Sequence, residues 1–239
     1  MEIYIGNITE HTTEYLETLV SPERVAQSSK YRFEADRKRS LLAHALLNHA
    51  VAAEYPGTAV PVMPSTDGYG KPHLYISSES SEFHFSLSHS GDFAVCAVND
   101  SPVGVDIETV GKEADNIARR FFAGSELKYI HDAESFYHIW TLKESFMKVV
   151  GLGMKLPMDA FSITDYDPET GLCGFVVNGK KEHRLSDAPE YNNLIPFIKP
   201  GTDLFTVLGK CMTYMDSYSL AVATPALDAD DINIIPCRF

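Results

Sequence analysis

Residues 135–150 constrain the fold most, because they are apolar on nearly every side of a predicted helix. A helix of this kind is normally buried against other elements. It nevertheless carries Lys143, Glu144 and Lys148, and buried charges are costly unless they are paired or bind a ligand. Glu144 and Lys148 are one helical turn apart and share a face with Trp140. The segment therefore predicts either a structural ion pair or a site for a charged ligand.

An upstream strand, residues 104–108, carries two acidic side chains, Asp106 and Glu108. Alternate side chains of a strand point to opposite faces, so these two share a face, about 7 Å apart. Carboxylates this close repel each other unless a cation or a proton lies between them. Oxygen ligands on a rigid strand suit Mg²⁺, which takes its remaining ligands from water and phosphates. Taken alone, however, the pattern more commonly marks the acidic outer face of a strand.

Two further segments carry groups that can bind phosphate. Residues 83–91 end a predicted strand with Ser88 and His89, and a serine, a histidine and free backbone N–H groups can hold a phosphate there. A serine nucleophile with a histidine base is disfavoured, because the G-x-S-x-G elbow is absent. Residues 68–72 hold Lys71 in a glycine- and proline-rich loop that is not a P-loop. An ordinary polar turn and a surface lysine are the alternatives.

The composition excludes several classes of protein. The formal net charge of −13 disfavours non-specific binding to nucleic acid. Residues 24–39 differ from the rest, because they carry six basic side chains against two acidic ones. This stretch suits either an anion site or a solvated helix face. The four cysteines form no CxxC pair and the nine histidines show no zinc-ligand spacing. No apolar run reaches the ~18 residues of a membrane span, and the N-terminus does not resemble a signal peptide. We therefore expect a cytoplasmic protein without zinc.

The periodicity predicts two similar α+β halves, residues 1–108 and 109–239, each with a long helix followed by several strands. Helices are expected from Ser21-Pro22 onward and at residues 34–55, 114–122, 125–130 and 135–150. Strands are expected at residues 1–6, 73–76, 83–88, 93–98, 103–108, 161–166, 172–177, 205–207 and 219–223. Residues 178–202 show no clear pattern, and residues 228–239 look like a tail.

The order of these segments is more specific than any one of them. The chain contains Gly70-Lys71-Pro72, then Phe85-x-Ser-x-Ser88-His89-Ser90-Gly91, then Gly104-Val105-Asp106-Ile107-Glu108, then Trp140-x-x-Lys143-Glu144-Ser145-x-x-Lys148-x-x-Gly151-x-Gly153. Upstream lies Tyr31-Arg32-Phe33-x-x-Asp36-Arg37-x-x-Ser40. Over residues 24–165 this order resembles the 4′-phosphopantetheinyl transferases of the large, surfactin-synthetase-activating (Sfp-like) type.

The resemblance implies an α+β fold of two similar halves, with the active site in the cleft between them. It implies that Asp106, Glu108 and Glu144 bind Mg²⁺, and it does not separate Mg²⁺ from Mn²⁺. Coenzyme A would be the co-substrate. The residues that would contact it are Lys71, Ser88, His89 (on the 3′-phosphate), Lys148 (on the pyrophosphate) and, by a looser match, Arg24 and Ser40.

The implied reaction moves the phosphopantetheine arm of coenzyme A onto a serine of an acyl or peptidyl carrier protein and releases 3′,5′-ADP. A serine hydroxyl needs a base, and Glu144 is the best candidate, either directly or through a metal-bound water. Lys148 would stabilise charge on the leaving group. A Mg²⁺-dependent phosphohydrolase of coenzyme A or a nucleotide is the alternative, and a non-catalytic carrier-protein binder is a third reading. One chain would supply both walls of the site, so a monomer is expected.

Overall fold

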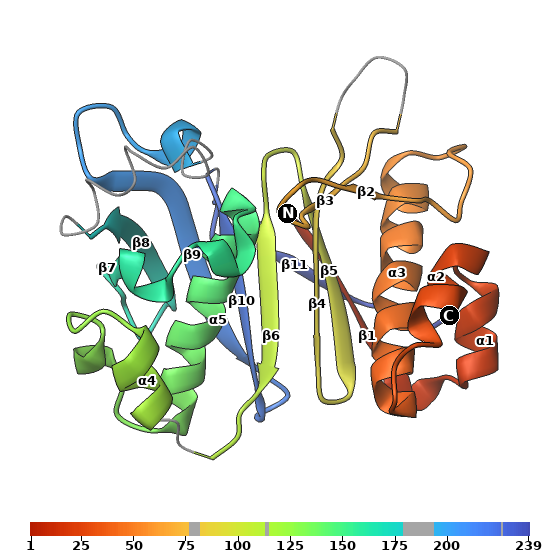
Figure 1. Ribbon diagram of the computed structural model, residues 1–239, viewed down its shortest axis with the longest axis horizontal. Coiled ribbons are helices and arrows are strands. Elements are labelled where there is room, and N and C mark those ends of the chain that lie inside the picture. Colours follow the sequence, from red (N-terminus) through yellow and green to blue (C-terminus); the bar gives the residue numbers. More distant parts are fainter. Residues whose placement is uncertain (77–81, 113–114, 179–193, 226) are drawn as a thin grey trace. The chain divides into compact units, whose positions relative to one another are not determined.

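The computed structural model describes residues 1–76, 82–112, 115–178, 194–225 and 227–239. The chain forms two compact units of mixed helix and sheet (Figure 1). Unit 1 comprises Met1–Asp67, Pro72–Asp100 and Asp230–Phe239, and unit 2 comprises Gly68–Lys71 and Ser101–Ala229. The α+β class expected from the sequence is therefore confirmed. The main boundary lies between Asp100 and Ser101 rather than after residue 108.

Unit 1 is built on a four-stranded sheet of order β11-β1-β5-β4, in which β11 is parallel to β1 and the other pairs are antiparallel. Its strands are β1 (Glu2–Asn7), β4 (His84–Ser90), β5 (Phe93–Asn99) and β11 (Asn233–Pro236). The long helix α3 (Glu34–Glu54) packs on this sheet through fully buried side chains that include Leu41, Leu42 and Leu46. A two-stranded ribbon of β2 (Ser65–Thr66) and β3 (Pro72–His73) is separate from it.

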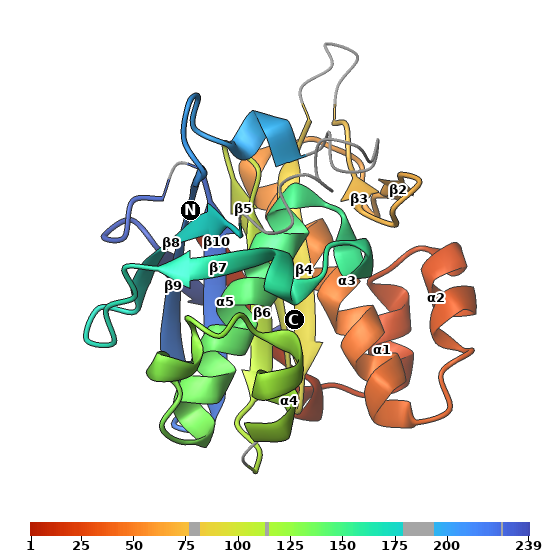
Figure 2. The same ribbon diagram turned by 60° about the vertical axis from the view of Figure 1, so that its left-hand side comes forward.

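Two short helices, α1 (Thr13–Thr18) and α2 (Pro22–Ser28), pack against α3, as Figure 2 shows. The start of α2 follows the sequence prediction. Ser21 Oγ accepts a hydrogen bond from the backbone N–H of Arg24 at 3.2 Å, and Pro22 occupies the first helical position. A proline is tolerated there because its missing N–H has no partner within the helix.

Unit 2 is a five-stranded antiparallel sheet of order β6-β10-β9-β8-β7. Its strands are β6 (Gly104–Thr109), β7 (Phe161–Thr164), β8 (Leu172–Val177), β9 (Leu204–Tyr214) and β10 (Tyr218–Thr224), and α4 (Asp115–Phe121) precedes the long helix α5 (Ala133–Val150). In Figure 1, α5 runs along β6 and β10. Its Phe146 ring lies 4.5 to 4.8 Å from the rings of Phe161, Phe175 and Phe205, at the centre of the core.

The ends of α5 are well defined by the sequence. Asp132 accepts a hydrogen bond from the N–H of Ser135, whose hydroxyl in turn accepts from the N–H of Asp132, so the two form a capping box. Gly151 ends the helix with φ of 76°, a left-handed conformation that glycine adopts without steric cost. The helix predicted at residues 135–150 is therefore confirmed and begins two residues earlier.

Several expectations need correction. Residues 233–236 of the expected tail form β11, because β1 offers an open edge for parallel pairing. The helix expected at 125–130 is only a 3₁₀ turn, Leu127–Tyr129, and the strand expected at 205–207 extends over all of β9. Of the strand expected at residues 73–76, only His73 lies in a strand, β3, and Tyr75 forms an isolated bridge with Glu82. Residues 179–193 of the unassigned segment lie outside the described residues.

No helix in the described part of the chain is both long and apolar enough to cross a membrane.

Candidate active site

The close approach of β6 to α5 depends on Gly104. A Cβ atom added at this position would lie 1.9 Å from the backbone oxygen of Ser145 and 3.0 Å from the backbone nitrogen of Val149. Any other residue would therefore push the strand away from the helix. The glycine of the strand motif thus allows the two motif segments to touch inside unit 2.

Lys148 joins these two segments directly. Its ammonium group donates hydrogen bonds to the backbone oxygen of Val105 at 2.7 Å and to Asp106 Oδ1 at 2.8 Å. The Asp106 side chain is 6% exposed and that of Lys148 is 29% exposed, so the pair lies at the edge of the core. A charge-assisted bond in such a place is stronger than a surface ion pair.

Glu144 lies on the same face of α5, one turn before Lys148, and is half-buried. Burial, together with the negative charges of Asp106 and Glu108 and against the opposing effect of Lys148, raises the pKa of its carboxyl group to about 7. The three predicted carboxylates are therefore close enough to influence one another. A group with a pKa near neutrality can both accept and release a proton at physiological pH.

The donor chemistry of this cluster suits a hard divalent cation, because carboxylate oxygens are the ligands that Mg²⁺ prefers and a cation would relieve their mutual repulsion. Within the described ranges, no three His, Cys, Asp or Glu side chains are arranged as a ready ligand set. The chemistry of the site therefore suits a metal ion, which would relieve the repulsion among Asp106, Glu108 and Glu144. The three carboxylates are not arranged in advance as a complete set of ligands.

Lys71, also in unit 2, lies at the C-terminal end of α5. Its ammonium group donates a hydrogen bond to the backbone oxygen of Val149 at 2.7 Å, one of the last carbonyl groups of the helix. A Cβ atom at Gly151 would lie 2.6 Å from Lys71 Cδ, so the glycine makes room for the lysine stem. Lys71 and Lys148 thereby place two positive charges along the last two turns of α5.

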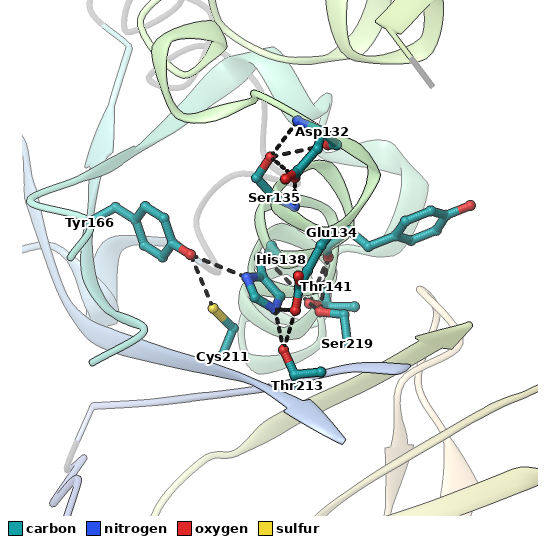
Figure 3. Close-up of polar contacts among 10 residues, drawn as sticks. Asp132, Glu134, Ser135, His138, Thr141, Tyr166, Cys211, Thr213 and Ser219 are labelled. Atoms are coloured by element: carbon teal, nitrogen blue, oxygen red, sulfur yellow. Dashed lines mark hydrogen bonds and ion pairs between the residues drawn. The ribbon is translucent and has the colours of Figure 1, made fainter. Parts of the chain in front are cut away.

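The first turns of α5 are fixed by polar contacts with β9 and with the segment that follows β7 (Figure 3). Thr213 on β9 donates to Glu134 Oε1 at 2.5 Å and lies 3.3 Å from His138 Nε2. The Tyr166 hydroxyl lies 3.4 Å from His138 Nδ1 and 3.6 Å from Cys211 Sγ. Burial lowers the pKa of His138, which favours a neutral imidazole in this network.

One turn further along, α5 is bound to β10. The hydroxyl oxygens of Thr141 and Ser219 lie 2.7 Å apart, both residues are fully buried, and Ser219 also donates to the backbone oxygen of Tyr137 at 3.1 Å (Figure 3). Buried hydroxyl pairs of this kind fix a helix against a strand, since any sliding would leave polar groups unsatisfied. The helix that carries Glu144 is thus held firmly before the site begins.

The remaining predicted residues lie in unit 1. Ser88 and His89 are both within β4, which continues to Ser90 instead of ending at them. Consecutive residues of a strand point to opposite faces, so the two side chains are not presented together by a strand end as expected. Arg24 lies on α2, and Ser40 is buried on α3.

Arg24 lines a small pocket between α2, α3 and residues 62–64. The pocket is also lined by His44, one turn after Ser40, and by Gln27 and Asn48. None of these three residues belongs to the motifs of the sequence. His44 and Asn48 show only a spacing signal, because they follow Ser40 at intervals of four residues on one helix face.

His44 should make unit 1 sensitive to acid. Burial, assisted by the charge of Arg24, lowers its pKa from 6.5 to about 3. As the pH falls below 6.5, the unfolded chain binds a proton that the folded chain does not, so stability is lost progressively toward pH 3. Between pH 7 and pH 5 the wild type should lose about 1–2 kcal/mol more unfolding free energy than His44→Gln.

Urea denaturation at both pH values measures this difference. His131→Gln, at an exposed position before α5, is the matched control and should behave like the wild type. Equal pH dependence in the wild type and His44→Gln would contradict the assignment.

Comparisons with known proteins match this arrangement. A family model described as 4′-phosphopantetheinyl transferase, N-terminal, matches residues 7–101, and one described as the 4′-phosphopantetheinyl transferase superfamily matches residues 102–188. The two models meet between residues 101 and 102, one residue after the structure divides at Asp100–Ser101.

Named relatives agree with the family models. The chain is 32% identical to "4′-phosphopantetheinyl transferase Sfp" of Bacillus subtilis (strain 168) over 162 residues, which cover 65% of this chain and 71% of the relative. It is 37% identical to "4′-phosphopantetheinyl transferase psf-1" of Bacillus pumilus over 155 residues, 62% of this chain and 65% of the relative. It is 30% identical to "4′-phosphopantetheinyl transferase gsp" of Aneurinibacillus migulanus over 171 residues, 69% and 70% respectively.

The chain therefore belongs to the 4′-phosphopantetheinyl transferase family. Its similarity to the Bacillus enzymes confirms the Sfp-like type that the order of the motifs predicted.

Proposed function

We propose that this enzyme transfers the 4′-phosphopantetheine group of coenzyme A to a serine of an apo acyl or peptidyl carrier protein and releases 3′,5′-ADP. The observation that carries the proposal is the direct contact, within unit 2, between the strand motif on β6 and the helix motif on α5. Lys148 of α5 holds buried Asp106 of β6, and Glu144 lies one turn away with its pKa raised to about 7. Family membership supplies the class of reaction.

Glu144 acts as the general base in this proposal. Transfer needs the carrier serine to lose its proton as it attacks phosphorus, and a base is most effective when its pKa lies near the working pH. The proton moves from the serine hydroxyl to a Glu144 carboxylate oxygen. The serine oxygen bonds to the phosphorus that carries the pantetheine arm, and the bond from this phosphorus to the bridging oxygen of the pyrophosphate breaks. Lys148 and Lys71 place positive charge where the 5′-phosphate of the departing 3′,5′-ADP becomes more negative, which stabilises the transition state.

Asp106, Glu108 and Glu144 would hold the divalent cation, which we propose to be Mg²⁺, with Mn²⁺ as a substitute. Such an ion, when bound, neutralises charge on the pyrophosphate. The chain's own residues would hold the remainder of coenzyme A through Arg24, Ser40, Ser88 and His89, with His89 at the 3′-phosphate. These assignments rest on motif matching together with the positions described above.

The rest of the proposal follows from the sequence. We expect a cytoplasmic monomer that acts on acyl or peptidyl carrier proteins and binds neither nucleic acid nor membranes. It stays a prediction that the two halves derive from one duplicated unit and that both contribute to one active site.

A phosphohydrolase would use similar groups, but the matched families and relatives give it no support. Mass spectrometry separates the two reactions. We expect an apo carrier protein incubated with the enzyme, coenzyme A and Mg²⁺ to gain the mass of one phosphopantetheine group on its serine. A carrier variant with that serine changed to alanine is the control. Release of free phosphopantetheine without carrier modification would refute the transfer.

A further inference from the structure

Lys143 of the helix motif lies outside the site formed by its neighbours. Its side chain is fully buried, whereas Glu144 and Lys148 are partly exposed. Its ammonium group donates to Glu126 Oε1 at 2.6 Å and to the backbone oxygen of Phe161 at 3.0 Å, and it lies 4.1 Å from the centre of the Phe161 ring. A group enclosed in this way is not available to a substrate.

Glu126 is buried as completely as Lys143, and both of its carboxylate oxygens accept hydrogen bonds. Its Oε1 also accepts from the N–H of Ile163 at 2.8 Å, and its Oε2 accepts from the N–H of Ala123 at 2.8 Å. The carboxylate therefore joins three segments: its own turn, β7 and, through Lys143, the middle of α5. The sequence shows no motif around Glu126 that would predict this partnership.

Stability alone explains such a pair poorly. The desolvation of two charges offsets most of their attraction, so replacing a buried ion pair by apolar side chains is often neutral or stabilising. A charged pair, unlike an apolar pair, is stable in only one arrangement of the helix, because both ions lose their partners if the helix rotates or slides. The directional hydrogen bonds that Glu126 accepts from two backbone N–H groups make that demand stricter.

The geometry of α5 connects this pair to the site. Successive residues of an α-helix project about 100° apart around its axis. Lys143 therefore fixes the rotation of the helix from the core side, while Glu144 projects next to it toward β6. Lys148 lies one turn beyond Glu144 on the side that meets Val105 and Asp106.

We infer that Glu126 and Lys143 are positioning residues for the transfer reaction. Their buried ion pair sets the rotation and axial position of α5, so that Glu144 and Lys148 face Asp106. This inference rests on the proposed function only where turnover is measured. Misplacing catalytic groups by about 1 Å can cost ~10²-fold in rate, so loss of the pair should reduce kcat more than it changes binding of coenzyme A.

Trp140 provides a readout that does not depend on catalysis. It is the chain's only tryptophan and lies one turn before Glu144 on α5. Its ring centre is 6.1 Å from that of Phe122 and 5.9 Å from that of Phe136. Phe136 belongs to α5 and moves with Trp140, but Phe122 lies outside the helix. Rotation of α5 would therefore change the contact between Trp140 and Phe122, and with it the emission of Trp140 and its quenching by acrylamide.

The experiment compares the wild type, Lys143→Met, Glu126→Leu, the double variant and Glu126→Gln. Each single apolar variant leaves one buried charge without its partner and should melt well below the wild type. The double variant should regain most of the melting temperature but keep an altered Trp140 quenching constant. Its kcat should stay at least about tenfold below wild type, with the KM for coenzyme A within about threefold. Lys128→Met, an exposed lysine in the same turn, is the matched control.

Glu126→Gln keeps the shape and one acceptor oxygen for Lys143, so it should fold and recover more kcat than the double variant. It therefore tests the inference even if the apolar variants do not fold. A double variant with wild-type melting, quenching and kcat would overturn the positioning role. If the variants change the quenching of Trp140 but the wild type itself transfers no phosphopantetheine, the proposed function fails while the pair is still shown to set the rotation of α5.

Discussion

Glu144→Gln should lower the turnover of carrier-protein modification by ~10²–10⁴-fold, the usual contribution of a general base. The substitution keeps the shape of the side chain and one acceptor oxygen but removes the charge and the basicity. The thermal midpoint should stay close to wild type or rise, because burial and two neighbouring carboxylates oppose the Glu144 charge. Initial rates in the presence of Mg²⁺ measure the effect on turnover, and melting curves of the metal-free protein measure the effect on stability.

Lys148→Met separates catalysis by Glu144 from a purely structural pair of the two residues. If Glu144 served only as the partner of Lys148, the double variant would recover what either single change lost. A catalytic Glu144 leaves the double variant inactive. The control is Glu169→Gln, which makes the same substitution at an exposed turn before β8 and should keep wild-type turnover. A Glu144→Gln protein that melts early but turns over within a few-fold of wild type would contradict the assignment.

The sequence predicted those parts of the site that are set by local pattern. The apolar periodicity of α5 indicated a buried helix, and the alternation in β6 placed Asp106 and Glu108 on one face. Both patterns depend only on the geometry of a single element. The proposed pairing of Glu144 with Lys148 was one of two local alternatives, and the structure shows Lys148 bound to Asp106 from a distant strand.

Contacts between distant segments could not be predicted in the same way. Glu126 carries no motif, and its partnership with Lys143 depends on how a short turn and β7 meet α5. The close approach at Gly104 follows from packing of β6 on Ser145, which no periodicity encodes. The pairing of β11 with β1 joins the two ends of the chain, and short strands carry too little pattern to fix such a partner.

Asp106→Asn should abolish most transfer while unit 2 stays folded. The amide keeps the size of the side chain and can still accept a hydrogen bond from Lys148. It loses the negative charge that makes the group a good ligand for a hard cation. Losing one charge-assisted contact costs about 1.5–3 kcal/mol, which corresponds to roughly tenfold to hundredfold weaker metal binding.

The Mg²⁺ concentration that gives half-maximal rate should therefore rise by about ten- to a hundredfold in Asp106→Asn, and direct titration with Mn²⁺ should show the same loss without any turnover. A structural role makes a different prediction, because Asp106 would then matter only as the partner of Lys148. In that case Asp106→Asn combined with Lys148→Met would restore both melting and rate, since neither residue would leave a buried charge behind. If Asp106 is a metal ligand, the double variant regains its melting temperature but not its affinity for Mn²⁺. Near-normal transfer by Asp106→Asn in dilute Mg²⁺ would remove Asp106 from the metal site.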